Sequence, residues 1–509
     1  MSEVKVNKIT PRTDCGTTQL GDSGDTVTVT GDLRSNSLKA ADGGVIISQS
    51  GTTITVGASG DTVSLASGAS QSGFGRAGSV DWQTSIKTGD FTAVSGEGYF
   101  VNTTGGAITV TLPSSPSAGA IVAVKDYANT SDTNTITIGR NGSNIDGTAS
   151  NAVITNEGGS IVLVYADATK GWLVVEAAQK SDISFPSFIA ATGGTVTTVC
   201  TNFKVHTFTG PGTFCVSNAG NAFGSNTVDY LVVAGGGGAG GDVGGAGGAG
   251  GLRFSNSTFT NSGPSSPRNG ASALPVTATG YPVAVGGGGA AGGPGNGTPP
   301  GTKGTDSTFT GTSTITSTGG GQGGGGASPE AGQPGGSGGG GRSNSCAPNP
   351  GSGNTPPVTP SQGMNGGSVG GSPGKGGGGG GGFMVVGTTG SGPGPGNGGP
   401  GGSGGGFPAA AFGPANGQAN TATGPAAPGT PDGFKYFAGG GHGGSITGCL
   451  GPTPACNGAL GGGGVVKAFP NPGGAGLTNT GGGGSGGTGN DTGGGAGGSG
   501  IVVIRYRFQ

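Results

Sequence analysis

The sequence contains little charge, and few of its residues are basic. Only 9% of the 509 residues are charged, and the formal net charge is −2. Nucleic-acid binding needs a basic stripe that neutralises phosphates, so we expect no nucleic-acid partner. No apolar run is long enough to span a membrane. The N-terminal stretch MSEVKVNKIT lacks the apolar core of a secretion signal, so we expect a protein made in the cytoplasm without secretion.

Residue patterns that support catalysis or metal binding are also missing. The two histidines, His206 and His442, have no neighbouring Asp, Ser or Cys in a triad or zinc-site arrangement. Lys375 is followed by Gly376, where a Walker A loop needs Ser or Thr. The carboxylates are too dispersed to nominate a glycosidase pair. We therefore expect no enzymatic activity, no cofactor and no metal.

Cysteine is scarce as well, with six residues that are too few and too dispersed for a disulfide scaffold. Two pairs are close enough to bridge, and the sequence leaves both open: Cys449 with Cys456, and Cys200 with Cys215. Cys15 and Cys346 stand by themselves, and free thiols are the better interpretation for them.

Glycine, by contrast, dominates the C-terminal half. The 131 glycines and 32 prolines make up about a third of the chain, a composition that is usually disordered when it has no strict period. Runs such as 376–382 break a Gly-X-Y repeat and exclude a collagen triple helix. However, the half opens with VDYLVVAGGGG (228–238) and closes with GSGIVVIRYRF (498–508). Two apolar strands that bracket the glycines predict a folded module.

Several predicted strands of this half run directly into glycine tracts, as in LVVAGGGG and VAVGGGG. If these strands lie side by side, the tracts leave them side by side and can stack as polyproline-II-like helices, which have no internal hydrogen bonds. Ordering each backbone costs about 1–2 kcal/mol, and an inter-helix hydrogen bond returns only about 1 kcal/mol. Positions that face two neighbours must therefore be glycine, and the glycine-poor interruptions should be loops at the ends of the bundle.

The rest of the chain divides into regions that differ in residue composition and pattern. Residues 1–75 contain the short alternating segments DTVTVTGDL, GGVIISQS, TTITVG and DTVSLASG, which predict short strands. These strands are too short for a monomeric core and favour an intertwined trimeric β-shaft over a flexible linker. Residues 76–180 are typical of a β-sandwich or barrel, with Trp82 and Trp172 expected in its core. Residues 181–201 are expected to be a linker, and 202–509 the glycine-rich domain. The predicted fold class is therefore all-β plus polyglycine-II.

These segments carry a resemblance. The frame VDYLVVAGGGG…GSGIVVIRYRF resembles the glycine-rich C-terminal domain of bacteriophage tail fibres and tail-tip adhesins, whose members form a polyglycine-II sandwich with receptor-binding loops at its end. The opening MSEVKVNKITP and the segment FTAVSGEGYFVNTTGGAITVTLP are similar to tail-fibre proteins of marine phages. The resemblance implies a virion protein that docks to baseplate or tail proteins at its N-terminus. At its C-terminus it would bind a bacterial surface polysaccharide or an outer-membrane protein.

We expect binding in loops at the end of the bundle, within segments 383–386, 407–412, 434–437 and 446–456. Exposed aromatic and apolar residues on loops favour recognition, and the candidates are Phe383, Met384, Phe407, Phe412, Phe434, Tyr436, Phe437, Ile446 and Leu450. The alternative for these side chains is that several of them cover the ends of the bundle. The alternative for the whole protein is a structural or ice-interacting glycine-rich protein without a specific receptor.

Overall fold

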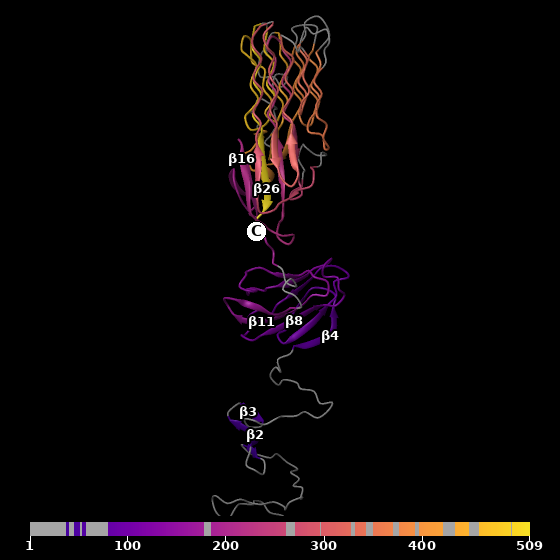
Figure 1. The fold of residues 1–509 in the computed structure, drawn as a ribbon, viewed down its shortest axis with the longest axis vertical. Coiled ribbons are helices and arrows are strands. Elements are labelled where there is room, and N and C mark those ends of the chain that lie inside the picture. Colours follow the sequence, from indigo (N-terminus) through magenta and orange to yellow (C-terminus); the bar gives the residue numbers. More distant parts are fainter. Residues whose placement is uncertain are drawn as a thin grey trace, which may run out of the picture. The chain divides into compact units, whose positions relative to one another are not determined.

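The computed structural model describes residues 37–39, 45–50, 53–56, 80–177, 185–260, 270–295, 297–326, 331–342, 350–369, 376–391, 397–420, 433–446, 458–489 and 491–509. The chain divides into two compact units, Met1–Ser79 and Val80–Gln509. Each is described by itself, and Figure 1 gives the labels of the elements.

The first unit contains a three-stranded antiparallel sheet of β1 (Ser37–Lys39), β2 (Val45–Ser50) and β3 (Thr53–Val56). Two of the predicted short strands, in GGVIISQS and TTITVG, are therefore confirmed. Those predicted in DTVTVTGDL and DTVSLASG lie outside the described residues. Ile47 and Val56 are register partners on neighbouring strands, and each is 43% exposed.

The domain at 80–177 is built from two sheets around one core. One sheet has the order β12-β11-β8-β6-β4 and the other β10-β9-β7-β5. The bounds are β4 (Asp81–Lys87), β5 (Phe91–Thr92), β6 (Glu97–Val101), β7 (Ile108–Thr111), β8 (Ile121–Asp126), β9 (Ile136–Gly139), β10 (Ala152–Ile154), β11 (Ser160–Asp167) and β12 (Gly171–Ala177). From β4 to β9 the chain alternates between the sheets, so pairs within each sheet, such as β6 with β8, are parallel.

The core of this domain confirms one tryptophan prediction and corrects the other. Trp172 is fully buried among side chains such as Val110, Ile138 and Leu163. Trp82 is 38% exposed, so the prediction that it belongs to the core is wrong. The physical reason is the face of the sheet on which it lies: the Trp82 ring packs against Phe100, whereas Tyr99 and Val101, which alternate with Phe100 on β6, belong to the core.

Two further sheets form the frame of the glycine-rich domain. They have the orders β13-β16-β20-β21-β22 and β14-β15-β26-β17-β18, and β19 pairs with β17. The bounds are β13 (Ile189–Thr192), β14 (Thr195–Val199), β15 (Phe203–Phe208), β16 (Gly212–Ala219), β17 (Thr227–Val233), β18 (Leu252–Phe254), β19 (Leu274–Pro275), β20 (Gly280–Ala284), β21 (Ser307–Thr310), β22 (Thr314–Ser317) and β26 (Ile501–Arg507). The linker predicted for 181–201 is corrected by this structure, because β13 and β14 pair with β16 and β15 as parts of the frame.

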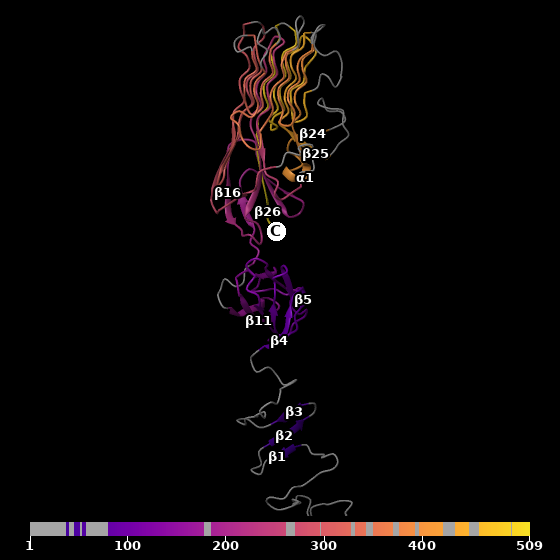
Figure 2. The same cartoon turned by 90° about the vertical axis from the view of Figure 1, so that its right-hand side faces the viewer.

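The sheet that contains β17 and β26 is buried on both faces. Val232 and Ile504 contribute to the core between the two sheets, whereas Leu231 and Val503 contribute to a second core on the opposite face. That second core is covered by β23 (Gly405–Pro408), α1 (Ala409–Phe412), β24 (Gln418–Ala419) and β25 (Phe434–Phe437), seen beside β26 in Figure 2. Burial on both faces explains why β17 and β26 are nearly continuous apolar runs.

Beyond the frame, the glycine tracts form a set of extended segments, here called the glycine sheaf, between Ala234 and Gly500. Figures 1 and 2 show these segments side by side, running from the sheets to a far end where they turn back. Most of their residues are buried, and they are neither α-helix nor β-strand. In the described part of the glycine-rich domain, the four-residue α1 is the only α-helix.

Candidate functional site

Main-chain hydrogen bonds join each central segment of the sheaf to several neighbouring segments. Successive residues of the segment bond to different neighbours in a repeating order. The N–H groups of one segment donate as follows: Gly235 and Gly238 to Thr305 and Thr302, Gly236 and Ala239 to Gly498 and Gly495, and Gly237 and Gly240 to Gly248 and Gly245. Its carbonyl groups accept with the same spacing, for example from Gly320 and Gly323. The partner segment thus recurs every third residue.

At most glycines in the interior of the sheaf there is no space for a side chain. A Cβ atom added at Gly378 would lie 2.0 Å from the carbonyl oxygen of Gly367. One added at Gly380 would lie 1.9 Å from the oxygen of Gly247. Neighbouring backbones therefore touch at these positions, and the turns between segments can change in sequence without separating them.

The path of the chain sorts these turns into two groups. β17 leads into segment 235–241, which reaches the far end at Asp242 and returns along 245–251 to β18. The chain continues to cross the sheaf from one end to the other, and each crossing is here called a traverse. The turns between traverses therefore alternate between the far end and the end beside the sheets, here called the sheet end. The described far-end turns are linked to one another, since Asp242 N–H donates to Thr492 and Gly489 N–H donates to Ser445.

Two exposed apolar side chains mark the far end. Phe469 is 55% exposed and Ile446 is 39% exposed. The ring of Phe469 lies over Gly489, where an added Cβ would be 2.5 Å from two ring carbons and 3.4 Å from the oxygen of Ile446. Lys467 and Asp491 are exposed nearby on the turns that contain or flank these residues. The described far end thus presents a small mixed surface on closely packed backbone.

A buried ion pair lies beneath the turns that form this surface. Arg342 Nη2 and Asp242 Oδ2 are 2.6 Å apart, and the two side chains are only 5% and 10% exposed. Arg342 also donates from Nη1 to the carbonyl of Gly326 at 3.3 Å. Asp242 and Val243 both adopt positive φ, of 55° and 53°, in the turn between two segments. The pair ties together three traverses where they turn.

The aromatic residues expected on binding loops lie instead at the sheet end. Phe383, Phe407, Phe412 and Phe437 are at most 2% exposed and belong to the second core, on the face of the sheet formed by β17 and β26. Tyr436, between Lys435 and Phe437 in β25, is 4% exposed. The expectation that these five side chains are exposed is therefore wrong, because the apolar face of the sheet needs a cover and these segments supply it.

The other candidates have different positions. Met384 packs against the same core and Phe434 is half-buried in β25. Ile446 lies at the far end, as expected, and Leu450 lies outside the described residues. Sequence reasoning missed Phe469. Counting traverses from β17 would have found it, because the interruption at 468–472 is a far-end turn whereas 383–386 is not.

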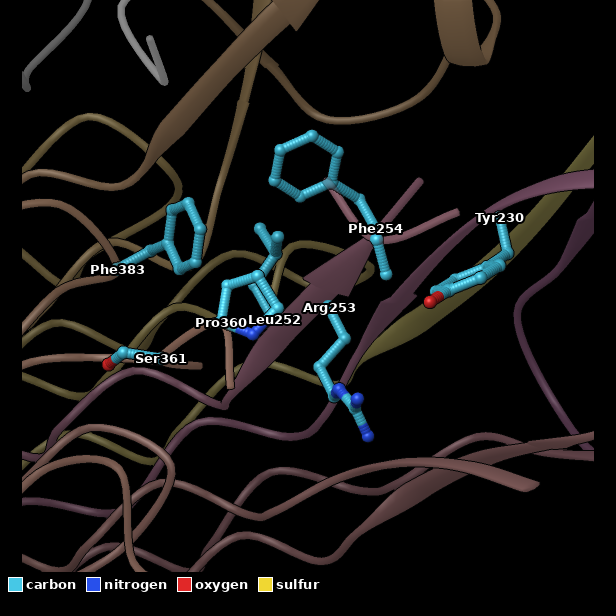
Figure 3. Close-up of a pocket in the computed structure, with 8 residues that line it drawn as sticks. Tyr230, Leu252, Arg253, Phe254, Pro360, Ser361 and Phe383 are labelled. Atoms are coloured by element: carbon cyan, nitrogen blue, oxygen red, sulfur yellow. The ribbon is translucent and has the colours of Figure 1, made fainter. Parts of the chain in front are cut away.

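Cavities elsewhere in the glycine-rich domain are of two kinds. A groove of about 640 Å³ lies between β14 and the segment 409–416, and it is lined mainly by threonine and alanine. Figure 3 shows a second cavity, between β18 and the turn at Pro360 and Ser361. Its volume of about 10 Å³ corresponds to roughly one water. Neither lies among the far-end turns.

Buried ionisable groups of the frame have structural partners. His206 Nδ1 donates to the carbonyl of Gly193 at 2.7 Å, so Nε2 accepts from the Tyr506 hydroxyl at 3.1 Å. Burial lowers the pKa of His206 below its ordinary value. Burial also lowers the pKa of Arg505, whose guanidinium lies 4.0 Å from the ring centre of Phe203. Asp229 accepts hydrogen bonds from Ser255 and from the N–H groups of residues 257 and 258, anchoring that loop.

The cysteine and metal expectations have separate outcomes. Cys200 and Cys215 are free and exposed, so they do not form the bridge that the sequence left open. Cys449 and Cys456 lie outside the described residues. Within the described ranges, no group of three His, Cys, Asp or Glu side chains is arranged to hold a metal ion. No helix in that part of the chain is long and apolar enough to cross a membrane.

Comparison with known proteins identifies the class of the C-terminal half. Residues 209–507 match the glycine-rich domain family, and the chain belongs to that family. The match begins directly after β15 and ends with the last residue of β26, so it covers the sheaf and the strands of the frame from β16 onward. No curated protein matches the chain.

Proposed function

We propose that this protein is a bacteriophage tail-fibre protein that attaches the virion to a bacterial host through the far end of its glycine sheaf. The N-terminal part docks to baseplate or tail proteins, and the far-end turns contact a surface polysaccharide or an outer-membrane protein. No catalytic step is part of the proposal. The observation that carries it is the alternation of the chain, which gathers the far-end turns at one end of a closely packed support.

The support is proposed to be a bundle of polyglycine-II helices. Such helices have three residues per turn and leave every N–H and C=O free to bond a neighbour. A hydrogen-bond partner that recurs every third residue, as at Gly235 and Gly238, is what this geometry requires. Recognition turns placed on such a bundle can vary without loss of the bonds beneath them.

The protein is proposed to be a homotrimer. In the first unit the register partners Ile47 and Val56 leave much of their apolar surface in solvent. A small sheet needs a covered apolar face to be stable, and neighbouring chains of a trimeric shaft would bury such side chains. Sedimentation equilibrium of the full chain tests this part, and a monomer at micromolar concentration would refute it.

The attachment proposal is tested by two matched substitutions. Phe469→Ala removes the most exposed apolar side chain of the far end, and Leu477→Ala removes a side chain that is 48% exposed in a sheet-end turn. Central interface residues often cost about 2 kcal/mol or more when truncated, so we expect Phe469→Ala to weaken adsorption to host cells by about tenfold or more. Leu477→Ala should adsorb like the parent. Equal adsorption of all three proteins would show that the described far end is not the contact.

A further inference from the structure

Trp82 is a partly exposed aromatic side chain, and one face of its ring has no apolar neighbour. It lies on β4, an edge strand of the five-stranded sheet in the domain at 80–177, and is 38% exposed. The other tryptophan, Trp172, is 0% exposed in the core of the same domain. Trp172 also lies on an edge strand, β12, so the exposure of Trp82 follows from the face of the sheet on which it lies, beside Phe100 and opposite the face that carries Tyr99 and Val101 into the core.

The indole of Trp82 is held flat against the sheet. Trp82 and Gly98 are register partners on β4 and β6. A Cβ at Gly98 would lie 2.8 Å and 2.9 Å from two ring carbons of Trp82, so the ring occupies the space that a side chain would fill. The Phe100 ring supports it further, with ring centres 4.9 Å apart and an angle of 30° between the planes. One face of the indole is thereby covered, and the exposed fraction belongs largely to the other.

Polar residues lie beside Trp82 along the strand. Thr84 is exposed two residues further along β4, where the pairing with β6 is irregular between Gln83 and Lys87. Asp81 and Gln83 flank Trp82 in the strand, and the Gln83 amide donates to the Asp81 carboxylate at 3.3 Å. Asp81 and Gln83 face the opposite side of the strand from Trp82, so the open face of the ring is chiefly a stacking surface.

The size of this patch argues against a stable protein partner. An aromatic side chain has about 150–250 Å² of surface, so the exposed part of Trp82 is roughly 60–100 Å². A stable protein interface covers about 800 Å² on each side. Ile86, 37% exposed further along β4, enlarges the patch only slightly. The area matches one small ring.

We propose that Trp82 is a stacking platform for a pyranose ring of a carbohydrate. A gluco- or galactopyranose in a β-linked chain presents a flat face of C–H groups, which packs on the open indole, while its hydroxyls remain in contact with water. This site is independent of the far end of the sheaf, and it neither needs nor replaces the attachment function proposed above. Binding by a single ring is weak, in the millimolar range.

The two tryptophans give a direct assay in the full-length protein. Acrylamide quenches the fluorescence of the exposed Trp82, whereas Trp172 is shielded, so protection from quenching reports on Trp82. The probes are cellohexaose and a β-1,4-galactose hexamer at millimolar concentration, and the matched control is sorbitol, which has hydroxyls but no ring. We expect one of the two hexamers to protect Trp82 and sorbitol to leave quenching unchanged.

Three substitutions identify the surface that binds. Trp82→Ala removes the aromatic anchor of the site, so it should lower affinity roughly tenfold or more, measured by affinity electrophoresis in gels that contain the polymer of the protecting sugar. Trp82→Phe should keep part of the affinity, and Ile86→Ala should keep nearly all of it. The proposal is overturned if neither hexamer protects Trp82 more than sorbitol does. It is also overturned if a bound sugar is retained equally by Trp82→Ala, which would place the sugar elsewhere.

Discussion

Substitution of single glycines tests whether the close packing of the sheaf holds the fold together. Gly378→Ala and Gly287→Ala make the same chemical change, yet their surroundings are opposite. At Gly378 the new Cβ would lie 2.0 Å from the oxygen of Gly367 and 2.8 Å from the oxygen of Ser368. At Gly287 the nearest atom is the hydroxyl of Thr305 at 3.9 Å, and φ is outside the left-handed region.

The magnitudes follow from these distances. Overpacking in a core costs about 1–3 kcal/mol and occasionally more, and here the colliding atoms are backbone atoms that cannot rotate away. Moving the segments apart also weakens the bonds from Gly378 to Gly341 and from Ala246 to Gly378, at 2.8 and 3.0 Å, each worth about 1 kcal/mol. We therefore expect Gly378→Ala to lower the free energy of unfolding by about 3 kcal/mol or more. Gly287→Ala should raise it by about 0.4–1 kcal/mol, because alanine restricts the unfolded chain.

The assay is differential scanning calorimetry of the full-length variants, with denaturant unfolding as a second measure. The two substitutions should shift the transition of the glycine-rich domain in opposite directions. If both leave it unchanged, the segments are not packed against one another as described. If both lower it equally, the cost arises from loss of glycine itself and not from contact between backbones.

Three further predictions concern buried side chains. Arg342→Met leaves the Asp242 carboxylate buried without a counter-charge, so stability should fall by about 3–5 kcal/mol, and a double-mutant cycle with Asp242→Asn should recover part of the loss. Because burial lowers the pKa of His206, this histidine takes up a proton in the unfolded chain at a higher pH than in the folded protein. Stability should therefore be full above about pH 6.5 and decline as the pH falls below it. Thermal unfolding of His206→Gln should lack this dependence on pH. Phe437→Ala empties a site that is 0% exposed and should lower stability by about 3–5 kcal/mol, while host adsorption, measured well below the unfolding temperature, should remain.

The local character of the chain could be predicted from its sequence. The apolar runs of β17 and β26 indicated paired strands, and the two strands are neighbours in one sheet. The glycine tracts between them indicated backbone in contact with backbone, because no other residue permits approach from several sides. The alternating segments of 80–177 indicated strands for the same local reason, since a period of two reflects one buried face.

The placement of the interruptions was decided by tertiary structure. Phe383 and Phe469 both interrupt glycine tracts, but one lies in the core beside the sheets and the other at the far end. Nothing local separates them, because the difference depends on how many times the chain has crossed the sheaf. Pro334 lies in a short traverse whose turn is not marked in the sequence by a glycine-poor interruption. The number of traverses is therefore harder to count from the sequence.

The role of an apolar side chain likewise depended on neighbours that are distant in the sequence. Trp82 and Trp172 both lie on edge strands, β4 and β12, yet Trp172 belongs to the core whereas Trp82 packs against Gly98 and Phe100 outside it. Residues 189–199 resemble a linker locally, but β13 and β14 complete the two sheets of the frame. The sequence by itself determined where backbone could pack closely and where strands would form. Which surfaces were covered was decided by the order of the strands and traverses, because burial depends on contacts between segments that no local pattern specifies.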